Sequence, residues 1–220
     1  MINFSLERGN FFASPINFHS HVSPAKEWET WMRDIFANPN FVRRLKSAGI
    51  YDAILMSKIH IRRDTRGLAF FVSRWCIETH TFFLAWGELT ITVEDVVSLL
   101  NLPTFRSVCP SYISLNPTEE RCMSTLERGI HDSTKEEEIG KSSKWPSLSG
   151  WIRYWRVINK VRSSEASFAN IITLWLSRHI FEDGAPFDGF KKELLPLAII
   201  LAAGEFVPLA VIFWRGPTTS

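Results

Sequence analysis

The predicted fold depends on one stretch, Thr79-His-Thr-Phe-Phe-Leu-Ala-Trp-Gly-Glu-Leu-Thr-Ile-Thr-Val-Glu-Asp-Val-Val-Ser-Leu-Leu-Asn-Leu-Pro103. Two short runs of β-branched and aromatic residues, 81–84 and 89–91, predict the strands of a β-hairpin. The four residues between them, 85–88, predict the turn, in which Gly87 is free to take a positive φ. We therefore expect one small β-hairpin at about 79–91.

A capped helix is predicted directly after the hairpin. Thr92 is a typical N-cap residue, and Asp95 lies three positions later, the spacing of a capping box. Apolar residues then recur at helical spacing until Pro103, which ends the helix. We expect the hairpin and its neighbouring helices to meet in a structural hub. Its predicted members are Arg74, Trp75, Trp86, Gly87, Glu88, Thr92 and Asp95.

Two members of this hub carry opposite charges. Arg74 lies near the end of the helix that precedes the hairpin, and Glu88 lies at the predicted turn. Because a partly buried carboxylate needs a partner, we expect an ion pair between them that locks the helix to the hairpin. The alternative is that Glu88 accepts hydrogen bonds from backbone amides or faces water. In either case the role is structural.

The same stretch resembles the signature of a known family. The similarity lies in Arg74-Trp75, Glu78-Thr-His-Thr-Phe82, Trp86-Gly-Glu-Leu-Thr-Ile-Thr-Val-Glu-Asp-Val96 and Leu99-Leu-Asn-Leu-Pro103, and the family is the plant mobile domain, also labelled aminotransferase-like and related to transposable elements. It continues in Ala48–Ile54, Ala169–Phe181 and Leu195–Glu205. Together these segments cover most of residues 25–214 in the order typical of the family.

The resemblance implies a function. Plant mobile domain proteins are nuclear factors linked to transposon silencing, genome integrity and meristem maintenance. Some resemble subunits that pair with a phosphoprotein phosphatase related to phosphatase 7. The resemblance therefore implies a non-catalytic protein-interaction module in the nucleus, carried by a host protein or by a truncated copy derived from an element.

The label aminotransferase-like invites a pyridoxal phosphate mechanism. That chemistry needs a Schiff-base lysine together with a phosphate-binding cup and an acidic partner for the ring nitrogen. No glycine- and serine-rich cup accompanies Lys58 in the helices before the hairpin. We therefore expect no cofactor and no enzyme activity.

Composition limits the remaining alternatives. A chain of 220 residues with 45% apolar side chains suits one domain with a sizeable core. Its three cysteines, Cys76, Cys109 and Cys122, are widely spaced and odd in number, which predicts a reducing intracellular compartment rather than a disulfide framework. No signal peptide is recognised at the N-terminus.

Hydrophobic periodicity predicts a mainly α-helical domain. Helical patterns begin at Ala25, Phe41, Tyr51, Asp64 or Thr65, Trp151, and Ser163 or Ser164. The predicted domains are a loosely ordered N-terminal segment at 1–24, a helical domain at 25–214 and a tail at 215–220. Within the helical domain, residues 104–149 are rich in proline, serine and acidic residues, which predicts a variable, partly mobile insertion with one possible helix over Thr118–Gly129.

The last apolar stretch, 194–214, has the length of a membrane span. Glu205 would lie near its centre, where an acidic side chain costs about 2.5–3.5 kcal/mol. Gly204 also falls where a helix C-cap is expected. We therefore predict two short buried helices and no membrane association. The second is expected to be shortened, because Arg215-Gly-Pro-Thr-Thr-Ser220 departs from the family pattern.

Individual polar residues indicate no catalytic or metal site. Glu94 and Asp95 are adjacent acids, but after Thr92 they occupy first-turn positions that stabilise a helix. His19 and His21 lack further ligands at zinc spacing, and His179 lies in an apolar helix that favours a core histidine. No nucleophile elbow, P-loop or dinucleotide-binding motif is present.

Uneven charge leaves one alternative function. Residues 43–74 contain eight bases and two acids, a net charge of +6, whereas residues 119–138 contain seven acids and three bases, a net charge of −4. The alternative is a nucleic-acid-binding module of a mobile element. We favour a solvated helix face, because no base-stacking pattern accompanies it. The candidate basic face comprises Arg43, Arg44, Lys46, Arg62, Arg63 and Arg66.

Overall fold

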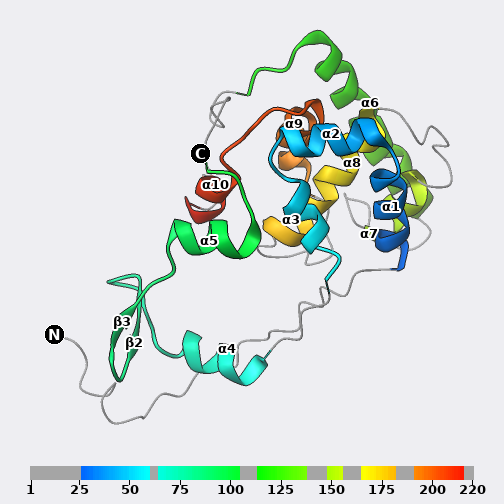
Figure 1. Ribbon diagram of the computed structural model, residues 1–220. Coiled ribbons are helices and arrows are strands. Elements are labelled where there is room, and N and C mark those ends of the chain that lie inside the picture. Colours follow the sequence, from blue (N-terminus) through cyan, green and yellow to red (C-terminus); the bar gives the residue numbers. More distant parts are fainter. Residues whose placement is uncertain are drawn as a thin grey trace.

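The computed structural model describes residues 26–59, 64–104, 113–137, 148–155, 165–181 and 191–215. The predicted N-terminal segment with His19 and His21, the bases Arg62 and Arg63, and most of the tail lie outside these ranges. Within them the mainly α-helical fold is confirmed, and the small sheet has three strands rather than two. A helical body occupies one end of the molecule, and α4 and the sheet occupy the other (Figure 1).

The helices and strands follow the chain in this order: α1 Lys26–Phe36, α2 Pro39–Ser47, α3 Tyr51–Met56, α4 Thr65–Val72, β1 Trp75–Cys76, β2 Thr81–Leu84, β3 Gly87–Leu89, α5 Val93–Leu100, α6 Pro117–Glu137, α7 Leu148–Arg153, α8 Glu165–Trp175, the π-helical η2 Leu176–Ile180, the 3-10 helix η3 Lys192–Leu194, α9 Leu195–Ala203 and α10 Leu209–Arg215.

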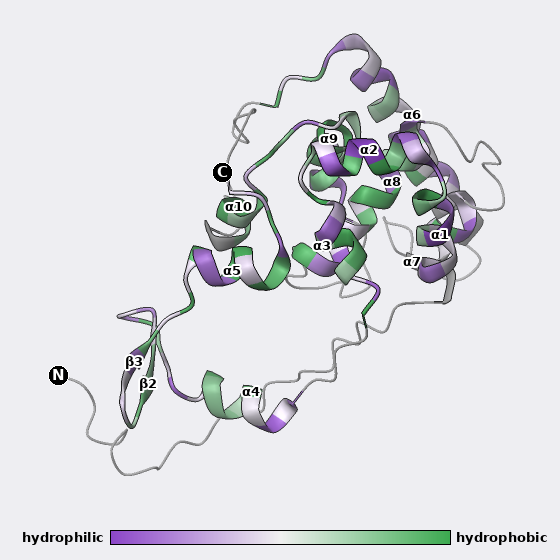
Figure 2. Ribbon diagram, viewed as in Figure 1, coloured by the Kyte–Doolittle hydropathy of each residue, from purple (hydrophilic) through white to green (hydrophobic). Residues whose placement is uncertain are grey.

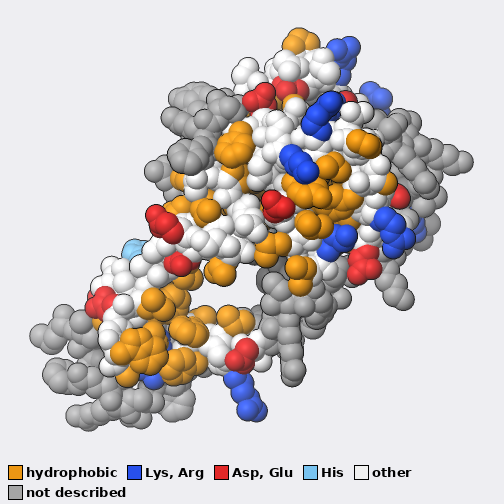
Figure 3. Space-filling view, viewed as in Figure 1, with side chains coloured by type: hydrophobic (Ala, Val, Ile, Leu, Met, Phe, Trp, Pro, Cys, Tyr) orange, Lys and Arg blue, Asp and Glu red, His pale blue; other side chains and the backbone are white. Residues whose placement is uncertain are grey.

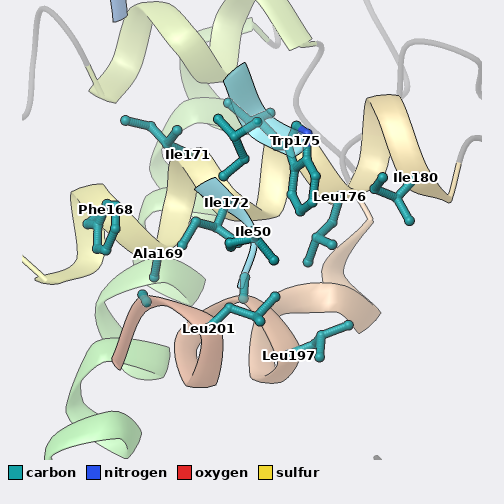
Figure 4. Packing of buried hydrophobic residues seen from close by; sticks show 14 of the residues in the cluster. Ile50, Phe168, Ala169, Ile171, Ile172, Trp175, Leu176, Ile180, Leu197 and Leu201 are labelled. Atoms are coloured by element: carbon teal, nitrogen blue, oxygen red, sulfur yellow. The ribbon is translucent and has the colours of Figure 1, made fainter. Parts of the chain in front are cut away.

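The core is centred on α8 and α9. Every residue of α8 after Glu165 is buried, and so are seven residues of α9. A helix that is apolar on all sides leaves apolar surface in contact with water unless other helices surround it. Both helices therefore lie inside the helical body. Figure 4 shows side chains such as Ile172 and Leu201 meeting between the two helices.

Two contacts fasten α2 to this core. The ring of Phe41 stacks on that of Phe168, with 4.2 Å between ring centroids. Arg44 forms a bidentate ion pair with Glu165 at the start of α8, in which Nη2 donates to Oε1 at 2.9 Å. The hydrogen bonds to Glu165 raise the pKa of Arg44. The stacked rings supply the buried area, and the ion pair sets the relative position of the two helices.

The possible helix within the predicted insertion at 104–149 is present and is longer than expected. Residues 117–137 form the long helix α6, which packs against α8 and α9. Leu126 and Ile130 on this helix are buried in the core. Cys122 and Met123 pack beside them one turn earlier, so the contact face has helical spacing, while the rest of the helix is polar.

The prediction of two short helices in the last apolar stretch is confirmed. Gly204 ends α9 with a left-handed φ of +94°, and its N–H donates back to the carbonyl of Leu201 at 3.0 Å. Residues 205–208, which end at Pro208, then separate α9 from α10. Among the described residues, no helix is both long and apolar enough to cross a membrane.

Gly49, which ends α2, provides a first prediction. Its φ is +70°, and a Cβ atom placed there would lie 2.4 Å from Cε2 of Phe206. Gly49→Ala is expected to lower the free energy of unfolding by about 1–2 kcal/mol from backbone strain alone, with a further loss from the displaced ring. Urea denaturation of Gly49→Ala in the native and Phe206→Ala backgrounds separates the two terms. An equal loss in both backgrounds would contradict the predicted ring contact.

Candidate protein-interaction surface

The three strands form a small antiparallel sheet in the order β1-β2-β3. In its register Trp75 pairs with Phe82, and Phe82 pairs with Leu89, so these three side chains share one face. Thr81 and Glu88 belong to the opposite face by the same alternation. The sheet therefore has one strongly apolar face and one more polar face.

Helix α4 lies against the apolar face. It begins at the N-cap Asp64, whose carboxylate accepts hydrogen bonds from the N–H groups of Arg66 and Gly67. The ring of Phe71 meets that of Phe82 edge-on at 6.0 Å between centroids, and Trp75 lies 4.8 Å from Phe82. We call α4 together with β1, β2 and β3 the aromatic lobe.

The aromatic lobe leaves much of its apolar surface in contact with water. Leu68, Phe71 and Val72 have the spacing of a helix face that packs on a core, but α4 contains no buried residue. Figure 2 colours the end of α4 near the sheet as hydrophobic, and Figure 3 shows hydrophobic side chains gathered over the lobe. The exposed large apolar residues in and beside the lobe are Leu68, Phe70, Phe71, Val72, Trp75, Ile77, Trp86, Leu89, Ile91 and Leu99.

An exposed apolar surface of this kind is unusual in a soluble domain. Single exposed apolar side chains need no explanation, whereas a contiguous group commonly marks a site of interaction with another molecule. The chain continues from β3 of the lobe into α5, and α5 packs on α10 of the helical body (Figure 1). The aromatic lobe is therefore the candidate functional site.

The structural hub predicted at this place is only partly present. Trp86 is 81% exposed and Trp75 is 39% exposed, so neither anchors the core. The turn of the hairpin is Ala85–Trp86, and Gly87 lies in β3 with a φ of +140°.

The capping box is confirmed. The Thr92 hydroxyl accepts from the N–H of Asp95 at 3.2 Å, and the Asp95 carboxylate accepts from the N–H of Thr92 at 2.8 Å. The carboxylate also accepts from the Thr92 hydroxyl at 2.9 Å, and the hydrogen bonds from the backbone N–H and then from this hydroxyl lower the pKa of Asp95. The capping box thus holds the start of α5, next to the aromatic lobe.

The predicted ion pair between Arg74 and Glu88 does not form. The Arg74 guanidinium lies over the ring of Phe70, 4.9 Å from its centroid, and Glu88 accepts from the hydroxyl of Thr81 at 3.1 Å. Arg74 precedes β1, and Glu88 lies in β3, so β2 separates the two residues. The cation–π contact offers the guanidinium an alternative partner, which the sequence does not reveal.

Glu88→Gln is therefore expected to change stability little. The Glu88 side chain is exposed, and an amide retains an acceptor oxygen for the Thr81 hydroxyl. We expect a loss of less than about 0.5 kcal/mol, typical of exposed surface substitutions. Thermal unfolding followed by circular dichroism checks this value, with Thr81→Val removing the same hydrogen bond from the other side. A loss of several kcal/mol would instead support the predicted buried ion pair between Arg74 and Glu88.

The candidate basic face is divided between separate elements. Arg44 is paired with Glu165, and the Lys46 ammonium lies 5.0 Å from the centroid of the Tyr51 ring. Arg43 donates to the side chain of Asn40 at 3.3 Å. Arg66 belongs to α4, which lies away from α2 (Figure 1). The described bases therefore do not form one continuous surface.

His179 is half-buried in an apolar environment, so its predicted core or boundary position is confirmed, but the hydrogen bond expected of a satisfied histidine is absent at Nε2. Its ring lies 5.6 Å from that of Trp28 between centroids, and its Nε2 is buried without a hydrogen-bond partner. Burial, followed by the charge of neighbouring Arg178, lowers the pKa of His179 to about 4. A neutral ring results at physiological pH. Among the described residues, no group of three His, Cys, Asp or Glu side chains is placed to hold a metal ion.

Comparisons with known proteins agree with this architecture. A mainly α-helical domain with a small three-stranded sheet is the class that the structure defines. The sequence model of the plant mobile domain matches residues 49–212, which include the aromatic lobe, and the chain belongs to this family.

Two Arabidopsis thaliana proteins are similar to the chain. A "Serine/threonine-protein phosphatase 7 long form homolog" is 30% identical over 116 residues, which are 46% of this chain and 8% of that protein. "Protein MAIN-LIKE 2" is 29% identical over 111 residues, which are 45% of this chain and 15% of that protein. The chain thus spans a small part of each relative. No solved structure matches it.

Proposed function

We propose that this chain is a non-catalytic protein-interaction module and that the aromatic lobe is its docking surface. One observation carries the proposal: Phe70, Phe71, Trp75 and Leu89 are substantially exposed although they lie together on one small structural unit. Aromatic side chains bury large areas at low entropic cost, and for this reason they dominate the energetics of protein interfaces. A partner that covers the lobe removes this surface from water.

The charge of the three strands and the first turn of α5 favours protein over nucleic acid. Residues 75–95 contain four acids, Glu78, Glu88, Glu94 and Asp95, and no lysine or arginine, whereas Arg66 and Arg74 lie on the side of α4. Phosphate backbones are repelled by such a surface, whereas affinity for nucleic acid depends on lysine and arginine. A partner protein with apolar and basic residues is the better match.

The family suggests the partner and the cellular role. One relative is named as a phosphatase 7 long form homolog, and some family members resemble subunits paired with such phosphatases. We propose a phosphoprotein phosphatase related to phosphatase 7 as the partner. Nuclear localisation and a role in transposon silencing, genome integrity or meristem maintenance are the corresponding proposals for the cell.

Binding of the purified chain to a recombinant phosphatase 7-type protein tests this function. Leu89→Ser on the lobe is matched by Leu55→Ser on α3, since the two leucines are 49% and 40% exposed. We expect Leu89→Ser and Trp86→Ser to weaken binding by about tenfold or more, the loss of a single interface anchor. Leu55→Ser should leave binding unchanged.

The opposite pattern would argue against the lobe. Equal binding by the native chain and both lobe variants would place the interface elsewhere. Binding of a labelled DNA duplex at physiological salt that is lost in Arg43→Ala and Lys46→Ala would instead support the nucleic-acid alternative.

A further inference from the structure

We propose that β3 accepts an additional β-strand from a partner protein and that this strand carries alternating apolar and basic residues. The inference rests on the proposed interaction function and identifies the chemistry of the bound segment. It follows from three properties of β3: an open edge, a different character on each face, and a local excess of negative charge.

The open edge follows from the strand order. β3 is the last strand of the sheet and pairs only with β2 among the described strands. The N–H of Phe83 donates to the carbonyl of Arg74 at 2.9 Å, so the backbone groups of Phe83 face β1. Phe83 pairs with Glu88 across the hairpin. In an antiparallel ladder, the residue opposite an outward-facing residue also faces outward, so the N–H and C=O of Glu88 point away from β2.

Each face of β3 favours a different kind of side chain in the next strand. Leu89 lies on the apolar face with Phe82 and is 49% exposed. Glu88 lies on the opposite face with its carboxylate exposed and within 3.1 Å of the Thr81 hydroxyl. Cross-strand neighbours on one face interact directly. An added strand is thus stabilised by apolar residues beside Leu89 and by Lys or Arg beside Glu88.

The charge surrounding the edge strengthens the requirement for basic residues. Glu78 lies in the connection between β1 and β2, and Glu94 opens α5 just after β3; both side chains are exposed. No lysine or arginine between residues 75 and 95 balances them. An acidic strand would therefore meet like charges along this edge, whereas a basic strand would meet opposite ones.

A second copy of the chain is a poorer occupant of the edge. Two β3 strands paired about a two-fold axis at Glu88 would place two like carboxylates directly opposite each other, which is destabilising. A partner with a basic strand satisfies both the backbone groups and the charges, which is the basis of recognition by strand addition.

Synthetic peptides provide the test. The probe is an end-capped peptide of alternating Lys and Val, and binding to the full chain is measured by titration calorimetry and by hydrogen exchange of the outward-facing Glu88 amide. The first control peptide replaces each Lys with Glu. The second keeps the Lys-Val sequence but carries N-methyl groups on alternate backbone amides, which removes strand pairing and leaves the side chains.

We expect the Lys-Val peptide to bind and to protect the Glu88 amide from exchange, and each control peptide to bind about tenfold or more weakly. Glu88→Lys should invert the preference toward the Glu-Val peptide. Glu29→Lys, at an exposed position on α1, should leave it unchanged. Circular dichroism confirms that both variants are folded.

The results that would overturn the proposal are distinct from a failure of the proposed function. Equal binding of the N-methylated peptide would exclude strand addition, and equal binding of the Glu-Val peptide would exclude the charge preference. Either result with continued loss of phosphatase binding in Leu89→Ser would leave the interaction function standing. Concentration-dependent dimerisation abolished by Glu88→Lys would assign the edge to a second copy. Failure of the Lys-Val peptide to bind at millimolar concentration would also overturn the inference.

Discussion

Trp175→Ala is expected to lower the free energy of unfolding by about 3–5 kcal/mol, the range measured for removing a buried aromatic side chain from a core. Trp175 is 1% exposed and lies at the end of α8, within the buried hydrophobic cluster (Figure 4). The substitution removes the dispersion contacts of the indole and leaves a cavity that the surrounding helices fill only partly.

Trp86→Ala is the matched comparison, because it removes the same side chain from the tip of the hairpin. Trp86 is 81% exposed, so the expected change is within about 0.5 kcal/mol. Urea denaturation followed by far-ultraviolet circular dichroism measures both values. Similar losses for the two variants would contradict the division into a helical core and a peripheral aromatic lobe. A small loss for Trp175→Ala alone would show that the core is not centred on α8.

Acidification below pH 6.5 is expected to destabilise the fold through His179. In the folded state burial and the charge of Arg178 lower the pKa to about 4, from a value of 6.5 in the unfolded chain. The unfolded state therefore binds a proton first as the pH falls, and protonation favours unfolding. The stabilisation is complete above pH 6.5 and is lost progressively down to about pH 4. Two and a half pH units correspond to about 3 kcal/mol.

The measurement compares the native chain with His179→Gln in urea denaturation at several pH values from 7.5 to 4. Titration of the other groups is common to both proteins, so the difference between the two pH profiles isolates His179. We expect the native profile to fall more steeply between pH 6.5 and pH 4. Parallel profiles would show that His179 is accessible to solvent, contrary to its position beside Trp28.

Local signals in the sequence were sufficient for most helix boundaries. Thr92 and Asp95 form the predicted capping box, Asp64 is the N-cap of α4, and Gly49 and Gly204 take left-handed conformations at helix ends. Each feature depends on residues a few positions apart, so it is specified before any tertiary contact forms. The residues of α8 are apolar on nearly all sides, a pattern typical of a central helix.

The position of each helix in the tertiary structure could not be predicted in the same way. The apolar residues of α4 have the spacing of a core helix, yet they lie on the exposed aromatic lobe. Helix α6 has a mainly polar sequence, yet Leu126 and Ile130 on it are buried in the core. The proposed Arg74–Glu88 pair failed for a related reason, since proximity in sequence does not determine which strand lies between two residues.

The sequence by itself therefore determined the helical class, the family and the caps, all of which rest on local patterns or on residue identity. The tertiary structure alone decided that the hairpin is peripheral and that α8 and α9 form the centre. Periodicity indicates that one side of an element is apolar, but it does not identify what covers that side. Burial depends on packing between segments distant in sequence, and for the aromatic lobe the described chain leaves that surface open to water.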